Sequence, residues 1–269
     1  TMYELKPFVS NTVWGYELWL ASTHPAGLSF AVNSLTKQES YLKDVVSDYP
    51  LLIKIIQADK TLSVQVHPDD EFAAIHENSR GKTECWYVLD AKPGVKLICG
   101  IENNLSKEDF LLALKNEKIN DFLHYVEVEK GDLIFIPAGT VHAISGGVRL
   151  LEVQESSNIT YRLYDWGRDR EMHLSKGLSV YKSIMSNPIK NFSDIFSCEF
   201  FSVELIQVEF GNSITCDKDF VLFATEGSGE LNSSFGDKIN CNPEMTIFCK
   251  KNEVIIPNSS FSFIKIISE

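Results

Sequence analysis

The sequence predicts a mainly β protein with a jelly-roll or barrel architecture. Short runs of β-branched and aromatic residues recur along the chain, and Gly, Asn, Asp and Pro residues separate them. Three longer stretches show helical patterns, and we expect them to be insertions between strands: residues 38–48, 69–78 and 106–124. Asp69 or Asp70 is expected to cap the second of these helices, and Ser106 with Asp109 approximates a capping box for the third.

The first strand that carries functional side chains is predicted at residues 62–67. Side chains on a strand alternate between its two faces, so Gln65 and His67 point to one side and the intervening valines to the other. Residues 83–89 are β-branched and aromatic and form the next such strand, with Glu84 near its start.

A third segment brings another histidine. Residues 133–136 are predicted to form a strand, residues 137–139 a turn, and residues 140–144 a second short strand that carries His142. The three segments therefore place metal-capable side chains in apolar or β-branched surroundings, where a charged group or an imidazole is costly to bury without a partner.

Composition excludes several classes of partner. The chain of 269 residues has 25 basic and 37 acidic side chains, a net charge of −12, which argues against nucleic-acid and anionic-membrane partners. No apolar run approaches transmembrane length, and no signal peptide is evident. The six cysteines show no metal-binding spacing, so we expect reduced, mostly packed thiols and a cytoplasmic protein.

Gln65, His67, Glu84 and His142 together suggest one metal site built from three strands. Two imidazoles, a carboxylate and an amide oxygen suit a borderline divalent ion such as Zn²⁺, and the lack of a thiolate ligand argues against a closed structural site. Cys85 follows Glu84 but should face the opposite side of the strand. Spacing alone leaves open that the two histidines are separate core or surface residues.

Four motifs extend this pattern, and together they resemble the type I mannose-6-phosphate isomerases of the cupin superfamily. In chain order they are Lys54-Ile55-Ile56-Gln57-Ala58 with Leu62 to Asp70, Gly81-Lys82-Thr83-Glu84-Cys85-Trp86-Tyr87, Pro137-Ala138-Gly139-Thr140-Val141-His142-Ala143, and Glu152-Val153-Gln154 with Thr160 to Trp166. Their order and approximate spacing agree with the short bacterial form. The resemblance covers roughly residues 3–182 and fades beyond them.

This resemblance implies a cupin barrel that holds one Zn²⁺ per chain and interconverts mannose 6-phosphate and fructose 6-phosphate. The reaction moves a proton between C1 and C2 of the sugar through a cis-enediol. A divalent ion bound by Glu84 as its single anionic ligand keeps a net positive charge, with which it can stabilise negative charge on the sugar oxygens. The expected partner is a small phosphosugar, for which a protein of negative net charge needs a local basic pocket.

Four further residues are candidates for the site, and the resemblance implies roles for three of them, Arg162, Ser63 and Lys82. Arg162 is the expected active-site arginine, able to hold enediolate or phosphate oxygens, although it could instead pair structurally with Asp165 or Glu152. Ser63 and Lys82 match positions near the substrate, the alternative being solvated strand ends. Glu152 and Lys82 compete as the proton-transfer group, Glu152 if burial raises its pKa and Lys82 if burial lowers its pKa.

The chain departs from the family pattern in places. Asn158 stands where an acidic residue is usual, Trp14-Gly15-Tyr16 replaces a common Gly-Gly sequence, and the C-terminal part is short and divergent. None of these departures removes a proposed ligand or Arg162.

Two domains are predicted, a catalytic metal-binding cupin domain at residues 1–185 and a smaller cupin-like β-domain at residues 186–269. The second domain is inferred from an internal echo, in which the segment around His142 aligns with residues 256–263 and Ser262 takes the place of the histidine. We therefore expect the second domain to lack a metal site. We expect a monomer or weak homo-oligomer.

Two other functions compete with the isomerase. The first is a cupin enzyme of different specificity, such as an oxygenase, although oxygenases favour iron and usually use more histidine ligands. The second is a non-catalytic sugar-binding cupin, which would not need the full ligand set together with Lys82 and Arg162.

Overall fold

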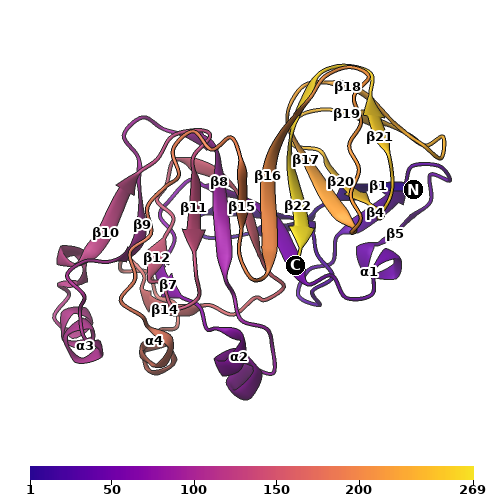
Figure 1. Cartoon of the computed structure of the whole chain (residues 1–269). Coiled ribbons are helices and arrows are strands. Elements are labelled where there is room, and N and C mark those ends of the chain that lie inside the picture. The colour runs from indigo at the N-terminus through magenta and orange to yellow at the C-terminus, as the bar shows by residue number, and fades with distance from the viewer. The chain divides into compact units, whose positions relative to one another are not determined.

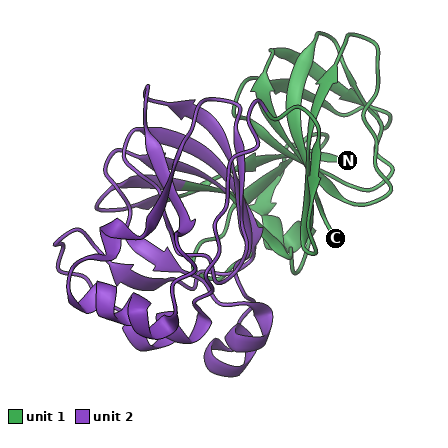
Figure 2. Ribbon diagram, turned by 60° about the vertical axis from the view of Figure 1, so that its left-hand side comes forward, with its two compact units in different colours: residues 1–9, 18–53, 192–269 green, residues 10–17, 54–191 purple.

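The structure is a computed structural model that describes residues 1–269, and it is mainly β, as predicted (Figure 1). The chain divides into two compact units (Figure 2). Unit 1 comprises Thr1–Val9, Leu18–Ile53 and Phe192–Glu269, and unit 2 comprises Ser10–Glu17 and Lys54–Asn191. None of the helices has the length and apolar character that a membrane-spanning helix requires.

Unit 2 is built around two sheets. The five-stranded sheet has the order β10 (Leu123–Glu127), β9 (Lys96–Ile101), β12 (His142–Ala143), β7 (Val64–Val66) and β14 (Tyr161–Tyr164). The six-stranded sheet has the order β11 (Leu133–Ile136), β8 (Glu84–Ala91), β13 (Val148–Glu155), β6 (Leu51–Ala58), β3 (Gly15–Ala21) and β2 (Phe8–Asn11). The last three of these strands each have residues in both units.

A shared core joins the two sheets of unit 2. Trp86 and Leu150 from the six-stranded sheet pack in one buried cluster with Leu97 and Cys99 from the five-stranded sheet. Because the side chains of a strand alternate, this apolar packing fixes which residues of β7, β8 and β12 face the interior. The same register thus decides where the candidate ligands point.

The helices of unit 2 lie together at its lower end in Figure 1. They are α2 (Asp70–Glu77), α3 (Lys107–Lys115), the 3₁₀ turn η1 (Ile119–Asp121) and α4 (Leu174–Val180). Asp69 caps α2 by accepting from the backbone N–H of Phe72, and Ser106 caps α3 by accepting from the N–H of Asp109, which confirms both predicted caps. The buried ring of Phe110 stacks on Tyr181, with centroids 4.3 Å apart, and so anchors α3.

Two predicted helices were too long. Residues 38–48 contain only the four-residue helix α1 (Leu42–Val45), because β5 (Glu39–Tyr41) pairs with β4 (Phe30–Asn33) and sheet pairing overrides the helical pattern. The helix predicted at residues 106–124 ends at Lys115. Glu117 has a left-handed φ of 56°, which breaks the helix, and His124 belongs to strand β10.

Unit 1 also contains two sheets. The eight-stranded sheet has the order β15 (Ile195–Ser197), β16 (Phe201–Val208), β22 (Phe261–Ser268), β17 (Phe220–Glu226), β20 (Thr246–Cys249), β1, β4 and β5, where β1 is Met2–Lys6. The three-stranded sheet has the order β19 (Lys238–Cys241), β18 (Gly229–Ser233) and β21 (Ile255–Pro257). Side chains from both sheets form one core, in which Cys241 and Cys249 pack as small apolar groups.

The N-terminal strands belong to the same unit as the C-terminal third. Strand β1 lies between β20 and β4, with Met2 opposite Cys249. The sequence predicts that residues 1–53 belong to the catalytic domain, whereas most of them cluster with residues 192–269. The predicted lack of a metal site at residues 186–269 stays a prediction.

Candidate metal centre and adjoining pocket

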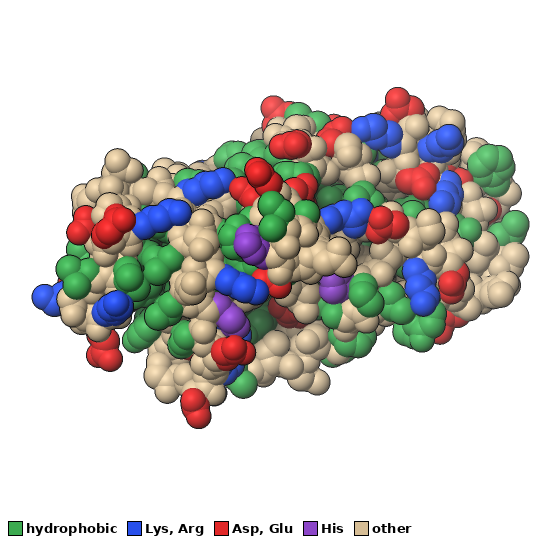
Figure 3. All heavy atoms as spheres, turned by 90° about the horizontal axis from the view of Figure 1, so that it is seen from below, with side chains coloured by type: hydrophobic (Ala, Val, Ile, Leu, Met, Phe, Trp, Pro, Cys, Tyr) green, Lys and Arg blue, Asp and Glu red, His purple; other side chains and the backbone are tan.

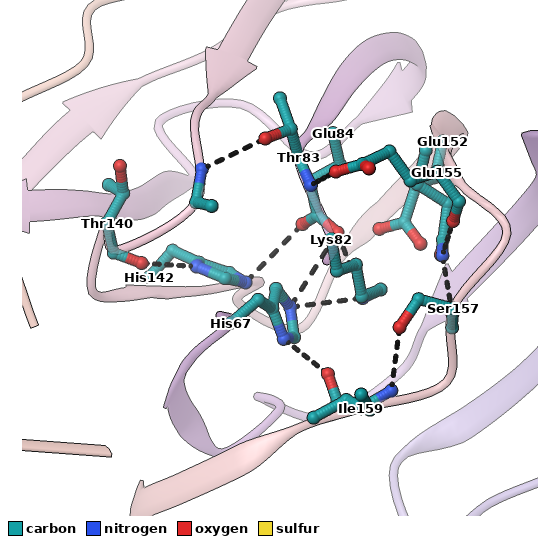
Figure 4. A network of polar contacts seen from close by, with 12 residues as sticks. His67, Lys82, Thr83, Glu84, Thr140, His142, Glu152, Glu155, Ser157 and Ile159 are labelled. Carbon is teal, nitrogen blue, oxygen red and sulfur yellow. Dashed lines mark hydrogen bonds and ion pairs between the residues drawn. The ribbon is translucent and has the colours of Figure 1, made fainter. Parts of the chain in front are cut away.

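Three segments of unit 2 converge on one buried cluster. His67 follows β7, Glu84 begins β8 and His142 begins β12. Each can offer one ligand atom, and these atoms lie within 4.8 Å of one another. All three residues are about 1% exposed. Figure 4 shows their side chains directed toward one another. This geometry confirms that the two histidines belong to one cluster with Glu84.

Strand register explains the convergence. His142 of β12 lies opposite Gln65 of β7, which in turn lies opposite Arg162 of β14. Directly opposed residues on neighbouring strands share a face of the sheet, so these three side chains form one row. Glu84 belongs to the other sheet, where it lies opposite Gln154. The site therefore forms where the inner faces of the two sheets meet.

Backbone contacts tie the ligand-bearing segments to one another. The N–H of Gly139 donates to the carbonyl of His67 (2.9 Å), and the N–H of Ala138 donates to the hydroxyl of Thr83 (3.2 Å). The N–H of Lys82 donates to the carbonyl of Pro68 (2.9 Å). These bonds hold the turn before His142 and the start of β8 against the end of β7.

Both imidazoles are held with Nε2 toward the cluster. Nδ1 of His67 lies 2.8 Å from the carbonyl of Ile159, and Nδ1 of His142 lies 2.9 Å from the carbonyl of Thr140. A carbonyl can only accept, so each Nδ1 carries the proton and each Nε2 presents a lone pair. Burial lowers the pKa of His67 well below its usual range and that of His142 to about 4, so both rings are neutral at pH 7.

The cluster fits a divalent metal ion. His142 Nε2 is buried and has no hydrogen-bond partner, and it lies 3.4 Å from Glu84 Oε1. His67 Nε2 lies 3.7 Å from Glu84 Oε2. Two neutral imidazoles and a carboxylate are donors that Zn²⁺ and similar ions accept, and the two histidines have the outer carbonyl partners that such ligands usually have.

Lys82 places a positive charge at the same point. Its Nζ lies 2.9 Å from Glu84 Oε2 and 3.0 Å from His67 Nε2. Burial by itself lowers the pKa of Lys82, but the carboxylates of Glu84 and Glu152 outweigh burial and raise the pKa above its usual value. The raised pKa favours the ammonium form of Lys82, and its role as a base stays a prediction.

Glu152 lies beside this cluster in apolar surroundings. The indole N–H of Trp86 donates to Glu152 Oε2 (3.0 Å) as well as to Glu84 Oε1 (3.1 Å). Burial, together with the nearby charge of Glu84, raises the pKa of Glu152, as the sequence analysis expected. The buried ammonium of Lys54 lies 3.7 Å from Glu152 Oε1 and 3.5 Å from Glu17.

Lys54 and Glu17 are site residues that the sequence analysis missed. The signal for Lys54 was present, because a lysine within the apolar run at residues 51–56 needs a buried partner. Glu17 gave no comparable signal, since its partner lies far away in the sequence.

A polar cavity of about 180 Å³ opens beside the cluster. It is lined by Thr12, Trp14, Glu17, Lys54, Ile56, Leu62, Ser63, Gln65, Lys82, Glu84, Ile144, Glu152, Asn158, Thr160, Arg162 and Arg170. The cavity thus brings Ser63, Gln65, Lys82, Glu152 and Arg162 together next to Glu84. Ser63 and Lys82 are buried and do not lie at solvated strand ends.

Arg162 does not make the structural ion pairs considered as alternatives. Its Nη1 donates to the carbonyl of Glu171 (2.8 Å), and its Nε is buried without a hydrogen-bond partner. The carboxylate of Asp165 instead accepts from Arg168 and Arg170, at distances of 2.7 to 3.0 Å. Arg162 and Arg170 thus both present positive charge to the cavity.

Two packed sheets that surround a buried His/Glu/His cluster and a polar cavity define a cupin barrel with a candidate metal centre. The model of the phosphomannose isomerase type I catalytic domain matches residues 2–96. A mannose-6-phosphate isomerase of Bacillus subtilis, ManA, is 35% identical over 244 residues, which span 80% of this chain and 77% of that protein. The chain belongs to the type I phosphomannose isomerase family.

Further similarities agree with this assignment. A mannose-6-phosphate isomerase of Streptococcus mutans is 39% identical over 181 residues, 61% of this chain and 57% of that protein. The crystal structure of a mannose 6-phosphate isomerase from Bacillus subtilis shares the fold, with a TM-score of 0.87 over 99% of both chains at 23% identity. A mannose 6-phosphate isomerase bound with zinc and yttrium has a TM-score of 0.73 at 16% identity, over 100% of this chain and 99% of that one.

Proposed function

We propose that the chain interconverts mannose 6-phosphate and fructose 6-phosphate by proton transfer between C1 and C2 of the sugar. Membership of the family supports this activity. The observation that carries the proposal is the adjacency of the His67, Glu84 and His142 cluster to a cavity that also contains Lys82 and Arg162. An oxygen of the sugar could approach a cation at the cluster, while the anionic groups of the substrate contact Lys82 and Arg162.

Zn²⁺, one per chain, is the metal that we propose for the cluster, with Gln65 as a fourth ligand. Gln65 lines the cavity, and it lies in the same cross-strand row as His142. When bound, a divalent ion supplies Lewis-acid stabilisation of negative charge on the sugar oxygens. Glu84 is the single anionic residue in this set, so the ligands leave a net positive charge for that task.

Glu152 is the side chain that we propose as the proton-transfer base. Its raised pKa brings the carboxyl closer to the working pH, where a group can both accept and return a proton efficiently. Trp86 fixes one carboxylate oxygen by donating to it. Lys82 stays an ammonium and would act on the sugar as a hydrogen-bond donor and counter-charge, together with Ser63.

Arg162 is proposed to hold anionic oxygens of the enediolate or the phosphate, with Arg170 nearby. The guanidinium group is always charged and can donate two parallel hydrogen bonds. A local basic group is needed because the chain carries a net charge of −12. Acidic and basic side chains are interspersed over the face that Figure 3 shows, so the arginines of the cavity are a local feature.

Metal analysis combined with a coupled assay on mannose 6-phosphate tests this proposal. One equivalent of zinc with turnover supports it, and a single equivalent also agrees with a second domain that lacks a metal site. Iron with oxygen uptake would favour another cupin enzyme, and tight sugar binding without turnover would favour a binding protein.

A further inference from the structure

Two carboxyl groups outside the ligand set hold the segment that leads into Glu84. The N–H of Gly81 donates to Asp70 Oδ1 (2.7 Å), and the N–H of Thr83 donates to Glu155 Oε2 (2.7 Å). Lys82 lies between these two anchored residues. Figure 4 shows Glu155 reaching from its own strand to Thr83.

The two carboxyl groups also lie close enough for a hydrogen bond between them, and this proximity contributes to the raised pKa of Glu155. Such a bond needs a proton on one of them, because two ionised carboxylates can only accept. Burial of Glu155 favours its neutral form, and the neighbouring charge of Asp70 adds to this effect. Together they raise the pKa of Glu155 to about 8, against a lowering effect of the Thr83 N–H. Glu155 is therefore mostly protonated at pH 7 and can donate to Asp70.

The segment between the carboxyl groups has little freedom to shift. A Cβ atom on Gly81 would lie 2.5 Å from the carbonyl carbon of Asp69 and 2.6 Å from the nitrogen of Asp70, so the two backbones are in close contact. The hydroxyl of Thr83 accepts from Ala138 on the turn that precedes His142. A movement of Thr83 would thus disturb segments that carry two of the proposed ligands.

We propose that Asp70 and Glu155 form a carboxyl clamp that positions Lys82 and Glu84 for catalysis. The inference rests on the proposed isomerase function and assigns to it two positioning residues that do not touch the substrate. Glu155 belongs to strand β13 and Asp70 to the first turn of helix α2, so the clamp also joins the helix to the barrel.

Several charged side chains lie on the elements that form the clamp. Helix α2 and its cap contribute Asp69 and Glu71 beside Asp70, and the clamped segment contributes Arg80 and Lys82. Asp69 is in ionic contact with Lys182, 3.4 Å away, and lies on the exposed side of the cap. Glu155 itself is buried, at 2% exposure.

Two substitutions of Glu155 distinguish the effect of its hydrogen bonds from the effect of its titratable proton. In Glu155→Gln, the amide oxygen can accept from Thr83 and the amide NH₂ can donate to Asp70, which copies the protonated acid. We expect this variant to keep kcat and zinc affinity within about threefold of the wild type. Glu155→Leu removes both bonds and should lower kcat or zinc affinity about 10- to 100-fold, the usual cost of losing an outer partner of a metal site.

The pH profile gives a readout that a purely structural role would not change. Above a pH of about 8, Glu155 loses its proton and two charged carboxylates face each other. We expect the activity of the wild type relative to Glu155→Gln to fall as the pH rises through this value. Asp132→Leu is the matched control, because Asp132 is another buried carboxyl group of unit 2 that accepts from backbone N–H groups, at Glu129 and Asn191. It should lower stability and leave kcat unchanged.

Zinc affinity, measured by competition with a chromophoric chelator, separates the clamp from the proposed function. If the wild type fails to turn over mannose 6-phosphate, the isomerase proposal fails, yet the affinity difference between the Gln and Leu variants still tests the clamp. Should Glu155→Leu not fold, Asp70→Ala offers a second test at an exposed position. It removes the bond between Asp70 and Glu155 and should lower kcat or zinc affinity to the same extent. Wild-type kcat and zinc affinity in Glu155→Leu or Asp70→Ala would overturn the inference, as would equal losses in Glu155→Gln and Glu155→Leu.

Discussion

The orientation of two imidazole rings decides what the centre can bind. Both Nδ1 atoms donate to backbone carbonyls, so the rings do not need to turn or exchange a proton before Nε2 meets a cation. Their lowered pKa values keep them neutral, which is the form that binds metal. Main-chain carbonyls of residues that are not ligands thus orient the two imidazole rings for metal binding.

His142→Ala should abolish metal binding and turnover together, because it removes one of two imidazole donors from a three-residue cluster. Metal content by elemental analysis and kcat by coupled assay measure the two effects. His124→Ala is the control, since His124 lies in β10 and contacts Glu102 and Asn187 instead. Full zinc content in His142→Ala would refute the proposed ligand set.

Arg162→Ala should keep the metal and lose turnover. The Arg162 side chain lines the cavity, and its Nη1 donates to the carbonyl of Glu171 and not to His67, Glu84 or His142. Loss of a charge-assisted bond to an anionic substrate costs about 1.5–3 kcal/mol, a fall of about 10- to 150-fold in kcat/KM. Turnover near the wild-type rate would show that Arg162 is only structural.

At the scale of elements, the alternation of strand side chains could be predicted, and long-range partners could not. Gln65 was expected on the face of His67, and register now places it opposite His142. The partnership of Lys54 with Glu17 and Glu152 depends on which strands become neighbours, and no local pattern contains that information. The prediction of a helix at residues 38–48 was wrong for the same reason, because β5 pairs with β4.

The segment before β8 yields a prediction at this scale. Gly81→Ala inserts a Cβ within 2.5–2.8 Å of backbone atoms at residues 68–70, and backbone cannot move aside as a flexible side chain can. We expect the free energy of unfolding to fall by about 1–3 kcal/mol, the usual cost of overpacking, and kcat to fall as Lys82 and Glu84 shift.

Gly94→Ala is the matched control for this variant. Gly94 has a left-handed φ of 74°, and no atom lies within 4 Å of the position that a Cβ would take, so the substitution strains the backbone without a clash. It should lower stability but leave kcat intact. An equal kcat in Gly81→Ala and the wild type would contradict the role given to this segment.

For the whole molecule, the protonation of Glu155 links stability to pH. The pKa of Glu155 is about 8 in the folded protein, compared with the ordinary value of 4.5 that applies to the unfolded chain. Between these two pH values the folded state therefore binds more protons than the unfolded state. This contribution to the free energy of unfolding is fully present below the reference pKa and is lost as pH rises toward 8.

Glu155→Gln has no such proton to lose. The free energy of unfolding of this variant should therefore gain on that of the wild type as pH rises from about 5 to about 8, and the gap should then level off. Urea denaturation at several pH values measures the gap. A constant difference across this window would show that Glu155 titrates normally in the folded protein.

The division of the chain has a consequence for its biosynthesis. Unit 2 is nearly continuous in sequence and can close once residue 191 has left the ribosome, whereas unit 1 needs both ends of the chain. Strand β1 pairs early with β4, yet its other partner, β20, is translated only after unit 2. While unit 2 is being translated, the nascent polypeptide therefore carries one edge of β1 without its partner strand, and such edges are what chaperones shield from aggregation.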